Sequence, residues 1–327
     1  MEISLIIPTY NRFDALIETL DTLTKIEFPH NSWEAVIVDD GSTDETESAV
    51  KKWVETSPIN IRYFRQENSG PARARNLGAQ EAKGKYLIFI DNDILVEPDF
   101  IKLHLESLQN NPNCWILGRI INSEKLKETP FGRFRDELHE NFDEFQSNSD
   151  LSESEGMTAA NVSMLKSEFL ELDGFDEGFS IASCEDLELA IRAKKRGIKI
   201  LYNRKISGLH NDWAVSLPAY CRRQMLYSIS DVLLCQKYGE ASPRLNLVKE
   251  NSPVNWQKDS WKTILKKGFK SIFANSFGQK MLENICYISE KLRPDSNLSH
   301  KTYNIAIGVA IFRGVRKGIK SYGTVKI

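Results

Sequence analysis

The stretch Leu87-Ile88-Phe89-Ile90-Asp91-Asn92-Asp93 places two aspartates directly after a run of apolar residues. Such a run is typical of a strand buried on both faces of a parallel sheet. Because side chains alternate along an extended chain, we expect Asp91 and Asp93 to point the same way where the strand ends. Adjacent carboxylates repel each other, and hard oxygen ligands suit Mg²⁺ or Mn²⁺ that holds a phosphate. A solvated turn has the same sequence pattern, so the surrounding segments must decide between the two.

Strand-like and helix-like segments alternate around this stretch. The predicted strands are 3–8, 35–38, 61–64 and 86–90, and the predicted helices are 14–26, 45–55 and 72–82. This alternation predicts the α/β class, with a Rossmann-like, mostly parallel sheet flanked by helices. Ligands of such sheets bind beyond the carboxyl ends of the strands. The polar groups after three strands (Pro8 to Tyr10, Asp39-Asp40, and Asp91 to Asp93) are therefore predicted to form one site.

The remainder of the chain predicts more of the sheet and then a helical extension. A helix and a strand are expected within 97–120, a helix over 187–196 and a strand over 198–202. Residues 123–155 are polar and acidic, which favours a mobile lid or a plain exposed loop. From residue 218 onward the pattern is helical. We therefore predict one domain over 1–215 and a mostly helical, basic region over 216–327.

Charge is distributed unevenly along the chain. Residues 256–327 hold 14 Lys and Arg against 4 Asp and Glu, whereas the whole chain has a net charge of −2. A basic region on an acidic body predicts either an anionic partner surface or docking onto the chain's own acidic part. The five cysteines form no Cys-x-x-Cys pair, which favours a reducing compartment. The residues before the first strand lack a charged segment followed by an apolar one, so we expect no signal peptide. The apolar run 305–312 is too short to span a membrane, so we expect no membrane-spanning helix.

Two segments near the first strands carry groups suited to a nucleotide. Asp40 follows a buried strand at a tight turn, where its carboxylate can bind a nucleobase or ribose, although Ser, Thr and Asp at such turns also cap helices. Asn68 and Arg75 flank the start of a helix with small residues, where anions are attracted. An exposed helix start with no ligand is the alternative at that segment.

Two further segments carry groups suited to catalysis or metal binding. Glu185 and Asp186 lie at the start of a helix, whose dipole favours the ionised form that a general base needs. An acidic helix start that only adds stability is the alternative. His210 follows the last predicted strand of the sheet, where it is either a structural histidine or a metal ligand beside Asp91 or Asp93.

Taken in order, these segments resemble glycosyltransferase family 2, which has the GT-A fold. The matching stretches cover roughly residues 3–212 and are Leu5 to Asn11, Val38 to Asp44, Asn68 to Gly78, Phe89 to Asp93, Asp173 to Glu177, and Glu185-Asp186. The resemblance implies an inverting, metal-dependent transfer of a hexosyl or N-acetylhexosaminyl group from a nucleotide-sugar, with UDP preferred, to an acceptor hydroxyl. It implies a role in making a cell-surface polysaccharide or glycoconjugate.

The same resemblance assigns roles to individual residues. Those that would border the nucleotide are Pro8, Tyr10, Asp40, Asn68, Arg75 and Asp91. Asp91, Asp93 and His210 would hold Mn²⁺ or Mg²⁺. Asp186, with Glu185 beside it, would be the general base.

The region beyond the resemblance leaves the acceptor open. Residues 220–225 lack the Gln-x-x-Arg-Trp element of processive synthases, so one sugar per encounter is expected. Apolar residues from Tyr303 to Ile319 run beside Arg313, Arg316 and Lys320, a pattern that fits a helix on an anionic membrane. Docking within the chain or a dimer contact is the alternative for this helix. These features favour a saccharide or lipid-linked acceptor, no nucleic-acid partner, and a cytoplasmic protein that is peripheral at the inner face of the membrane.

Two other classes compete with a sugar transferase. A nucleotidyltransferase also needs paired aspartates and a metal, but it would usually carry a Gly-rich basic loop after the first strand, where this chain has Pro8 to Arg12. A catalytically inactive sugar- or lipid-binding relative is disfavoured because Asp91, Asp93, Asp186 and His210 are all present.

Overall fold

The computed structural model describes residues 1–144, 149–179, 181 and 183–325. The chain divides into two compact units. Unit 1 comprises Met1–Ser123 and His139–Trp213, and unit 2 comprises Glu124–Leu138 and Ala214–Ile327.

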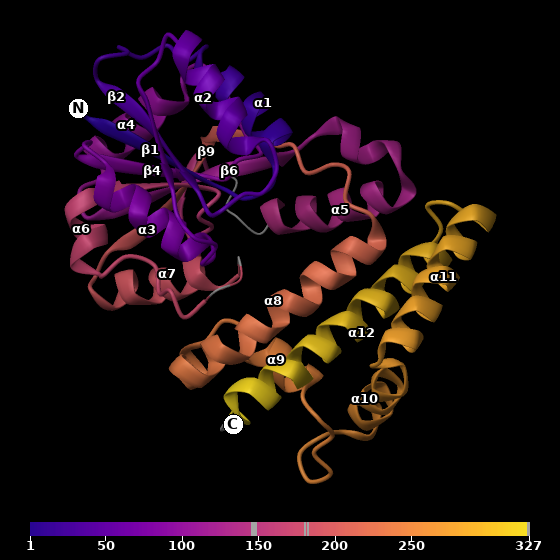
Figure 1. Ribbon diagram of the computed structural model, residues 1–327. Coiled ribbons are helices and arrows are strands. Elements are labelled where there is room, and N and C mark those ends of the chain that lie inside the picture. Colours follow the sequence, from indigo (N-terminus) through magenta and orange to yellow (C-terminus); the bar gives the residue numbers. More distant parts are fainter. Residues whose placement is uncertain (145–148, 180, 182, 326–327) are drawn as a thin grey trace. The chain divides into compact units, whose positions relative to one another are not determined.

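Unit 1 is built on one sheet (Figure 1). Its strands are β1 (Ile3–Thr9), β2 (Trp33–Asp39), β3 (Ile61–Arg65), β4 (Tyr86–Ile90), β5 (Ile94–Val96), β6 (Cys114–Asn122), β7 (Leu151–Glu153), β8 (Asn161–Leu165) and β9 (Lys199–His210). Their order is β3-β2-β1-β4-β8-β6-β9-β5, with β7 also paired to β9. The sheet is parallel from β3 to β4, as predicted, and mixed beyond, because β8 runs antiparallel to both β4 and β6. The predicted α/β class is confirmed.

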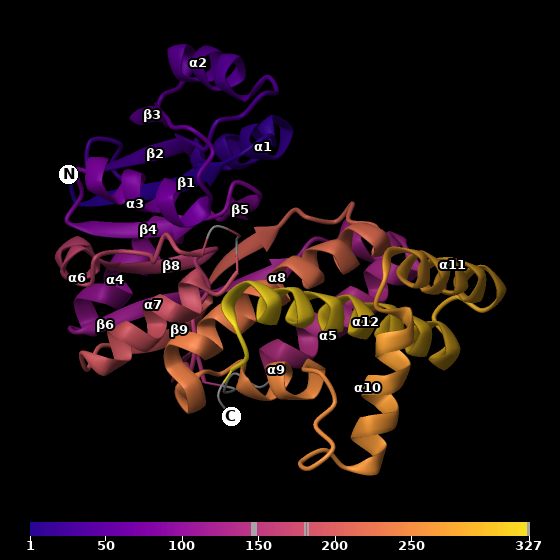
Figure 2. The ribbon, with the colours of Figure 1, turned by 60° about the horizontal axis from the view of Figure 1, so that its bottom comes forward.

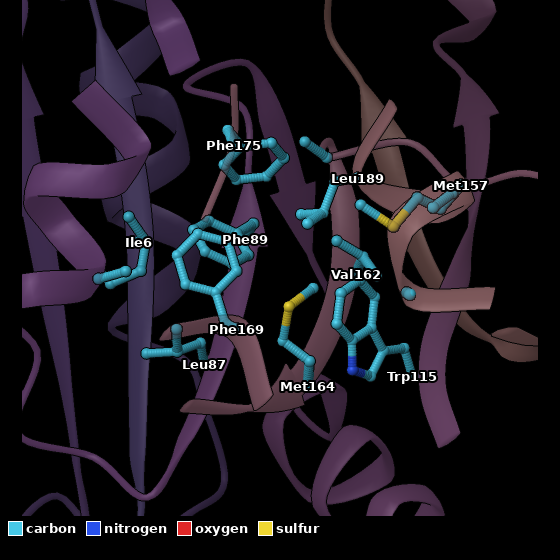
Figure 3. Packing of buried hydrophobic residues seen from close by; sticks show 14 of the residues in the cluster. Ile6, Leu87, Phe89, Trp115, Met157, Val162, Met164, Phe169, Phe175 and Leu189 are labelled. Atoms are coloured by element: carbon cyan, nitrogen blue, oxygen red, sulfur yellow. The ribbon is translucent and has the colours of Figure 1, made fainter. Parts of the chain in front are cut away.

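Helices cover both faces of this sheet, which explains its continuous apolar strands. The helices of unit 1 are α1 (Phe13–Leu23), α2 (Thr46–Thr56), α3 (Pro71–Glu81), α4 (Phe100–Asn110), α6 (Lys166–Glu171) and α7 (Glu185–Lys195). Leu87 and Phe89 of β4 pack on the face of α3, α6 and α7, where Phe89 meets Phe169 and Phe175 (Figure 3). Ile88 and Ile90 point to the other face, against α1, α2 and α4. Alternate side chains of one strand thus fill two cores.

A histidine is buried between α4 and the sheet. His104 Nδ1 lies 2.8 Å from Ser163 Oγ, and its Nε2 lies 2.9 Å from Asn161 Oδ1. Burial lowers the pKa of His104 to about 4, against a hydrogen bond to Asn161 that acts the other way. The imidazole is therefore neutral in the folded protein near pH 7.

We expect this histidine to make the fold sensitive to mild acid. Its folded pKa lies below the unfolded value of 6.5, so the unfolded chain binds more protons and stability falls as the pH drops from 6.5 towards 4. The loss from this group should reach about 3 kcal/mol. Urea unfolding at pH 7.5 and pH 4.5 should show a smaller pH effect in His104→Gln, whereas His30→Gln, at an exposed position, should behave as wild type. Equal pH dependence in both variants would contradict a neutral buried His104.

Unit 2 is helical, as predicted for the end of the chain (Figure 2). Its helices are α5 (Pro130–Glu144, of which the part to Leu138 lies in this unit), α8 (Leu217–Tyr238), α9 (Leu245–Asn251), α10 (Trp261–Phe273), α11 (Ser276–Leu292) and α12 (Asn297–Tyr322), with short 3₁₀ turns at Glu124–Glu128 and Gly239–Ala241. Helices α8 and α12 lie side by side along their length. Their backbones approach closely at Gly314, where a Cβ would lie 2.1 Å from the carbonyl oxygen of Met225. Only glycine fits there.

The interpretation of residues 123–155 as a lid or loop is wrong for most of the segment. It forms the helix α5, and Phe131 and Phe134 of this helix are buried against Tyr303, at ring-centroid distances of 5.2 and 5.1 Å. The polar residues lie around a narrow aromatic stripe that the overall composition conceals. Residues 145–148 lie outside the described residues.

The membrane-facing role predicted for the stripe from Tyr303 to Ile319 is also wrong. Tyr303, Val309, Phe312 and Val315 are at most 2% exposed, because they form the core of unit 2. The amphipathic face of α12 is therefore satisfied within its own unit. Within the described residues, no helix has both the length and the apolar character needed to cross a membrane.

Candidate active site

The carboxyl ends of β1, β2 and β4 meet at one edge of the sheet because these strands are parallel and adjacent. Thr9 is level with Asp39, so the segments that follow β1 and β2 leave the sheet together. Tyr10 is 46% exposed at this edge. Pro8, by contrast, is buried inside β1 beside Val38. Tyr10 thus lies where a ligand can reach it, whereas the ring of Pro8 is part of the sheet.

Asp40 braces the loop that leads into α3. Its Oδ1 accepts hydrogen bonds from Gln66 Nε2 at 2.7 Å and from the Ser69 backbone N–H at 2.8 Å, and its Oδ2 accepts one from the Gly70 N–H at 2.8 Å. A carboxylate has about four acceptor positions, so little capacity remains for a nucleoside. The carboxylate of Asp40 therefore acts mainly on the loop, and Asn68 within that loop is exposed.

A surface hollow of about 470 Å³ lies beside this loop. Its lining residues are Gly41, Arg65, Gln66, Glu67 and Asn68. Gly41 has a φ of +82°, and a Cβ there would lie 2.8 Å from the Asn68 backbone nitrogen. Both the backbone conformation and the close approach of the loop therefore require glycine.

Gly41→Ala should disturb the hollow as well as the fold. We expect a loss of stability of about 1–2 kcal/mol from the strained φ and weaker binding of UDP, because the Cβ pushes the loop at Asn68 away. Gly197→Ala is the matched control, since Gly197 has a φ of +79° with nothing within 4 Å of the added Cβ. Calorimetric titration with UDP should show weaker binding only in Gly41→Ala. Equal affinity in both variants would mean that UDP does not use this hollow.

Arg75 connects two segments that are far apart in the sequence. It lies on α3 and is buried, with Nη2 2.6 Å from Asp91 Oδ1 and Nη1 2.8 Å from Glu185 Oε1. Burial lowers the pKa of Arg75, but the negative charges of Asp91 and Glu185 outweigh burial and raise it. Arg75 is a permanently charged bridge between the end of β4 and the start of α7.

The two acidic residues at the start of α7 differ in their surroundings. Glu185 is 3% exposed, and its Oε2 has no hydrogen-bond partner among the residues that the structure describes. Burial and the charge of Asp186 raise the pKa of Glu185, while Arg75 acts against them. Asp186 is only half-buried, and its Oδ1 accepts a hydrogen bond from the Leu187 backbone N–H at 2.7 Å. Asp186 is therefore the more accessible of the two carboxylates.

Asp91 and Asp93 lie in a turn and not in a strand, so the alternation of strand side chains does not apply to them. Strand β4 ends at Ile90, and the Ile94 N–H donates to the Asp91 carbonyl to close a turn. Each aspartate meets a different cation: Asp91 meets Arg75, and Asp93 Oδ2 lies 2.8 Å from Arg12 Nη1. The repulsion between the two carboxylates is thus reduced by two arginines.

His210 lies beside Asp93 because β5 pairs with β9. Ile94 is level with His210 in this antiparallel pair, and the Asn211 N–H donates to the Asp93 carbonyl at 2.8 Å. His210 Nε2 is 3.7 Å from Asp93 Oδ2. Burial lowers the pKa of His210, but the nearby carboxylate of Asp93 outweighs burial and raises it.

These residues fit a divalent cation in part. Within the described residues, no group of three His, Cys, Asp or Glu is arranged to hold a metal ion, so the ligand set of Asp91, Asp93 and His210 stays a prediction. The carboxylate of Asp93 and the imidazole of His210 are close enough to share one ion. Mg²⁺ and Mn²⁺ commonly take their other ligands from phosphate and water. The donor set is therefore suited to a metal that arrives with a diphosphate.

The sequence-based reasoning missed Arg12. This side chain bridges Asp93 and Asp212, with Nη2 3.3 Å from Asp212 Oδ1, and it is 41% exposed. The sequence did contain a signal for Arg12. It is a positive charge directly after β1, at the edge of the sheet where several carboxylates were already predicted.

Comparison with known proteins identifies the family. A model of glycosyl transferase family 2 matches residues 4–170, just over half of the chain. The chain belongs to this family. The chain is 36% identical over 144 residues to an uncharacterised glycosyltransferase of Rickettsia felis; the aligned stretch is 43% of this chain and 22% of that relative. It is 28% identical over 275 residues to the validoxylamine A glucosyltransferase of Streptomyces hygroscopicus subsp. jinggangensis. This aligned stretch is 74% of this chain and 61% of the relative. The matched part is therefore less than two thirds of either relative.

A solved structure shares the fold. The mannosyltransferase PcManGT from Pyrobaculum calidifontis, in complex with GDP-Man and Mn²⁺, superposes with a TM-score of 0.61 at 18% identity, over 95% of this chain and 86% of the other chain. The likeness confirms the predicted GT-A fold.

Proposed function

We propose that this glycosyltransferase moves one sugar per encounter, with inversion, from a nucleotide-diphosphate sugar to the hydroxyl of a saccharide or lipid-linked saccharide. UDP is the preferred nucleotide, and synthesis of a cell-surface polysaccharide or glycoconjugate is the setting. Membership of family 2 supports a sugar transfer. A GT-A structure that was solved with a nucleotide-sugar and Mn²⁺ supports the class of donor.

The single observation that carries this proposal is the bridge made by Arg75. Its guanidinium contacts Asp91 at the edge of the sheet and Glu185 next to Asp186. One buried side chain therefore holds the donor edge and the acidic helix start in a fixed arrangement. A transferase needs this arrangement, because the group that binds the donor and the group that accepts the proton must both be positioned at the same sugar.

The residues then have the following roles in the reaction. The nucleotide is bordered by Tyr10, Asn68 and the loop that Asp40 holds through hydrogen bonds. Asp93 and His210 would hold Mn²⁺ or Mg²⁺. When bound, the metal ion would supply positive charge to the diphosphate. Asp186 takes the proton of the acceptor hydroxyl while the hydroxyl oxygen bonds to the anomeric carbon. The bond from that carbon to the diphosphate breaks on the opposite side, so a single displacement inverts the configuration.

A donor screen tests this function without knowledge of the acceptor. The enzyme, a panel of UDP- and GDP-sugars and Mn²⁺ are incubated together, and free nucleoside diphosphate from slow hydrolysis is measured by mass spectrometry. We expect release from at least one donor, with loss of release in Asp93→Ala but not in Asp99→Ala, a control at an exposed position. No release from any donor would overturn the proposed donor class. Unchanged release in Asp93→Ala would overturn the metal assignment alone.

A further inference from the structure

Helix α10 exposes several large apolar side chains to solvent and buries two of its four lysines. Trp261, Leu265 and Ile272 are 76%, 69% and 71% exposed, whereas Lys267 and Lys270 are 1% and 9% exposed. An amphipathic helix on a water-facing surface has the opposite arrangement. The orientation of α10 is thus the one expected of a helix that faces an apolar partner.

The buried lysines hold α10 in this orientation. Lys267 Nζ lies 2.8 Å from Asp259 Oδ2, and Lys270 Nζ lies 2.6 Å from Asn251 Oδ1. An ammonium group is costly to bury unless it is paired or hydrogen-bonded, and both are. Turning the apolar face inward would break these contacts. The exposed apolar face is therefore fixed by specific interactions on the other side of the helix.

The next helix adds a second apolar stripe. On α11 the exposed apolar residues recur at helical spacing and are Phe277 (80%), Met281 (38%), Ile285 (41%), Ile288 (55%) and Leu292 (75%). Leu282 and Cys286 of the same helix point inward to the core of unit 2. Figures 1 and 2 place α10 and α11 on the side of α12 away from α8, where α10 leads into α11. Two consecutive helices of unit 2 thus each expose a run of large apolar side chains, which is more than the single exposed residues of an ordinary surface.

The charges around these stripes are mainly basic. The exposed Glu250 lies 3.9 Å from Lys266, and the exposed Asp295, just after α11, is paired with Arg133. From residue 256 to 293, a stretch described throughout, the exposed ionisable residues are all basic: Lys258, Lys262, Lys266, Lys280, Lys291 and Arg293. The acidic residues of this stretch, Asp259, Glu283 and Glu290, are only half-exposed. An apolar face flanked by lysines suits a surface that is apolar below and negatively charged above.

We propose that the surface formed by α10 and α11, here called the basic apolar face, docks onto an anionic phospholipid membrane. The apolar side chains would lie among the lipid head groups and upper acyl chains, with the lysines at the phosphates. This inference goes beyond the proposed function and does not depend on it. A second copy of the chain is a poorer partner, because joining two such faces would bring lysines of like charge together.

Vesicle binding of the full chain tests the proposal directly. Co-sedimentation is measured with phosphatidylcholine vesicles that contain either no phosphatidylglycerol or about one third phosphatidylglycerol, at low and physiological salt. We expect binding to the anionic vesicles, weakened by salt, and little binding to the neutral ones. No binding to anionic vesicles at low salt would overturn the proposal.

Two pairs of variants then locate the binding surface. Lys262→Gln/Lys280→Gln/Lys291→Gln should weaken binding about 100-fold, whereas Lys25→Gln/Lys52→Gln/Lys102→Gln, three exposed lysines of unit 1, should have a much smaller effect. Leu265→Gln/Ile272→Gln should weaken binding at least about 10-fold. Leu151→Gln/Leu170→Gln, at exposed positions of unit 1, is its control.

The remaining readouts separate membrane docking from misfolding and from self-association. Circular dichroism and nucleotide release should be unchanged in all four variants, so that lost binding cannot reflect lost folding. Equal weakening by each variant and its control would overturn the assignment to α10 and α11. A concentration-dependent dimer that Leu265→Gln/Ile272→Gln abolishes, in a protein that ignores vesicles, would identify a second copy as the partner instead.

Discussion

Asp186→Asn is expected to slow the release of nucleoside diphosphate from the donor roughly 10³-fold while leaving UDP affinity unchanged. The half-buried carboxylate of Asp186 lies next to Glu185, which Arg75 links to Asp91. An amide cannot take a proton from an attacking hydroxyl or water, and loss of a general base typically costs 10²–10⁴-fold in rate. The amide oxygen can still accept the hydrogen bond from the Leu187 N–H, so the start of α7 should keep its structure.

The measurement uses water as the acceptor, with the donor found by the screen, and calorimetric titration with UDP. Glu171→Gln is the matched control, because it also neutralises a carboxylate, but at an exposed position of α6. Loss of UDP binding in Asp186→Asn would place Asp186 in the donor pocket rather than at the acceptor. A release rate equal to that of the control would show that another group is the base.

The parallel half of the sheet could be predicted because its strands are buried on both faces. Strands such as Ile3–Thr9 and Tyr86–Ile90 then become continuous apolar runs, which the sequence displays directly. The short strands β5 and β8 could not be found in this way, because their place in the sheet depends on antiparallel partners far along the chain. Helix α5 was missed because its buried stripe, with Phe131 and Phe134, is narrow within a polar segment.

The sequence predicts which edge of the sheet holds the candidate site, but not which side chains contact each other there. Strand ends located Asp40, Asp91 and Asp93, since parallel strands end together. The partners of these carboxylates depend on tertiary structure: Arg75 meets Glu185 across 110 residues, and Arg12 meets Asp93 across 81. No local pattern encodes such pairs. For the same reason, periodicity could not show that α12 would bury its apolar stripe while α10 would expose its own.

Arg75→Met should have the largest effect on stability among the site variants. Glu185 would remain buried without its cation, and breaking a buried ion pair on one side costs about 3–5 kcal/mol. Asp91, whose side chain is 36% exposed, can be solvated instead. Arg73→Met removes an exposed arginine from the same helix and should change the free energy of unfolding by less than about 0.5 kcal/mol. Urea unfolding measures both variants, and equal losses would contradict the bridge.

The double variant Arg75→Met/Glu185→Gln separates stability from function. It removes both charges, so most of the lost stability should return, because a neutral amide is far cheaper to bury than an unpaired carboxylate. Nucleotide release should stay low, because the Arg75 bridge between Asp91 and the start of α7 is then absent. Recovery of release together with stability would show that Arg75 serves the fold and not the reaction.

The pH dependence of stability in Arg75→Met tests whether the unpaired charge of Glu185 causes the loss of stability. Burial and Asp186 already raise the pKa of Glu185 above its usual 4.5, and removing Arg75, which lowers it, should raise it further. A carboxyl group whose pKa is higher in the folded state binds more protons there. Its stabilising effect is present at low pH and is lost as the pH rises through the folded pKa. The loss of stability in Arg75→Met, relative to wild type, should therefore be larger at pH 8 than at pH 5. An equal loss at both values would mean that the variant suffers from lost packing around the guanidinium, and that an unpaired charge on Glu185 is not the cause.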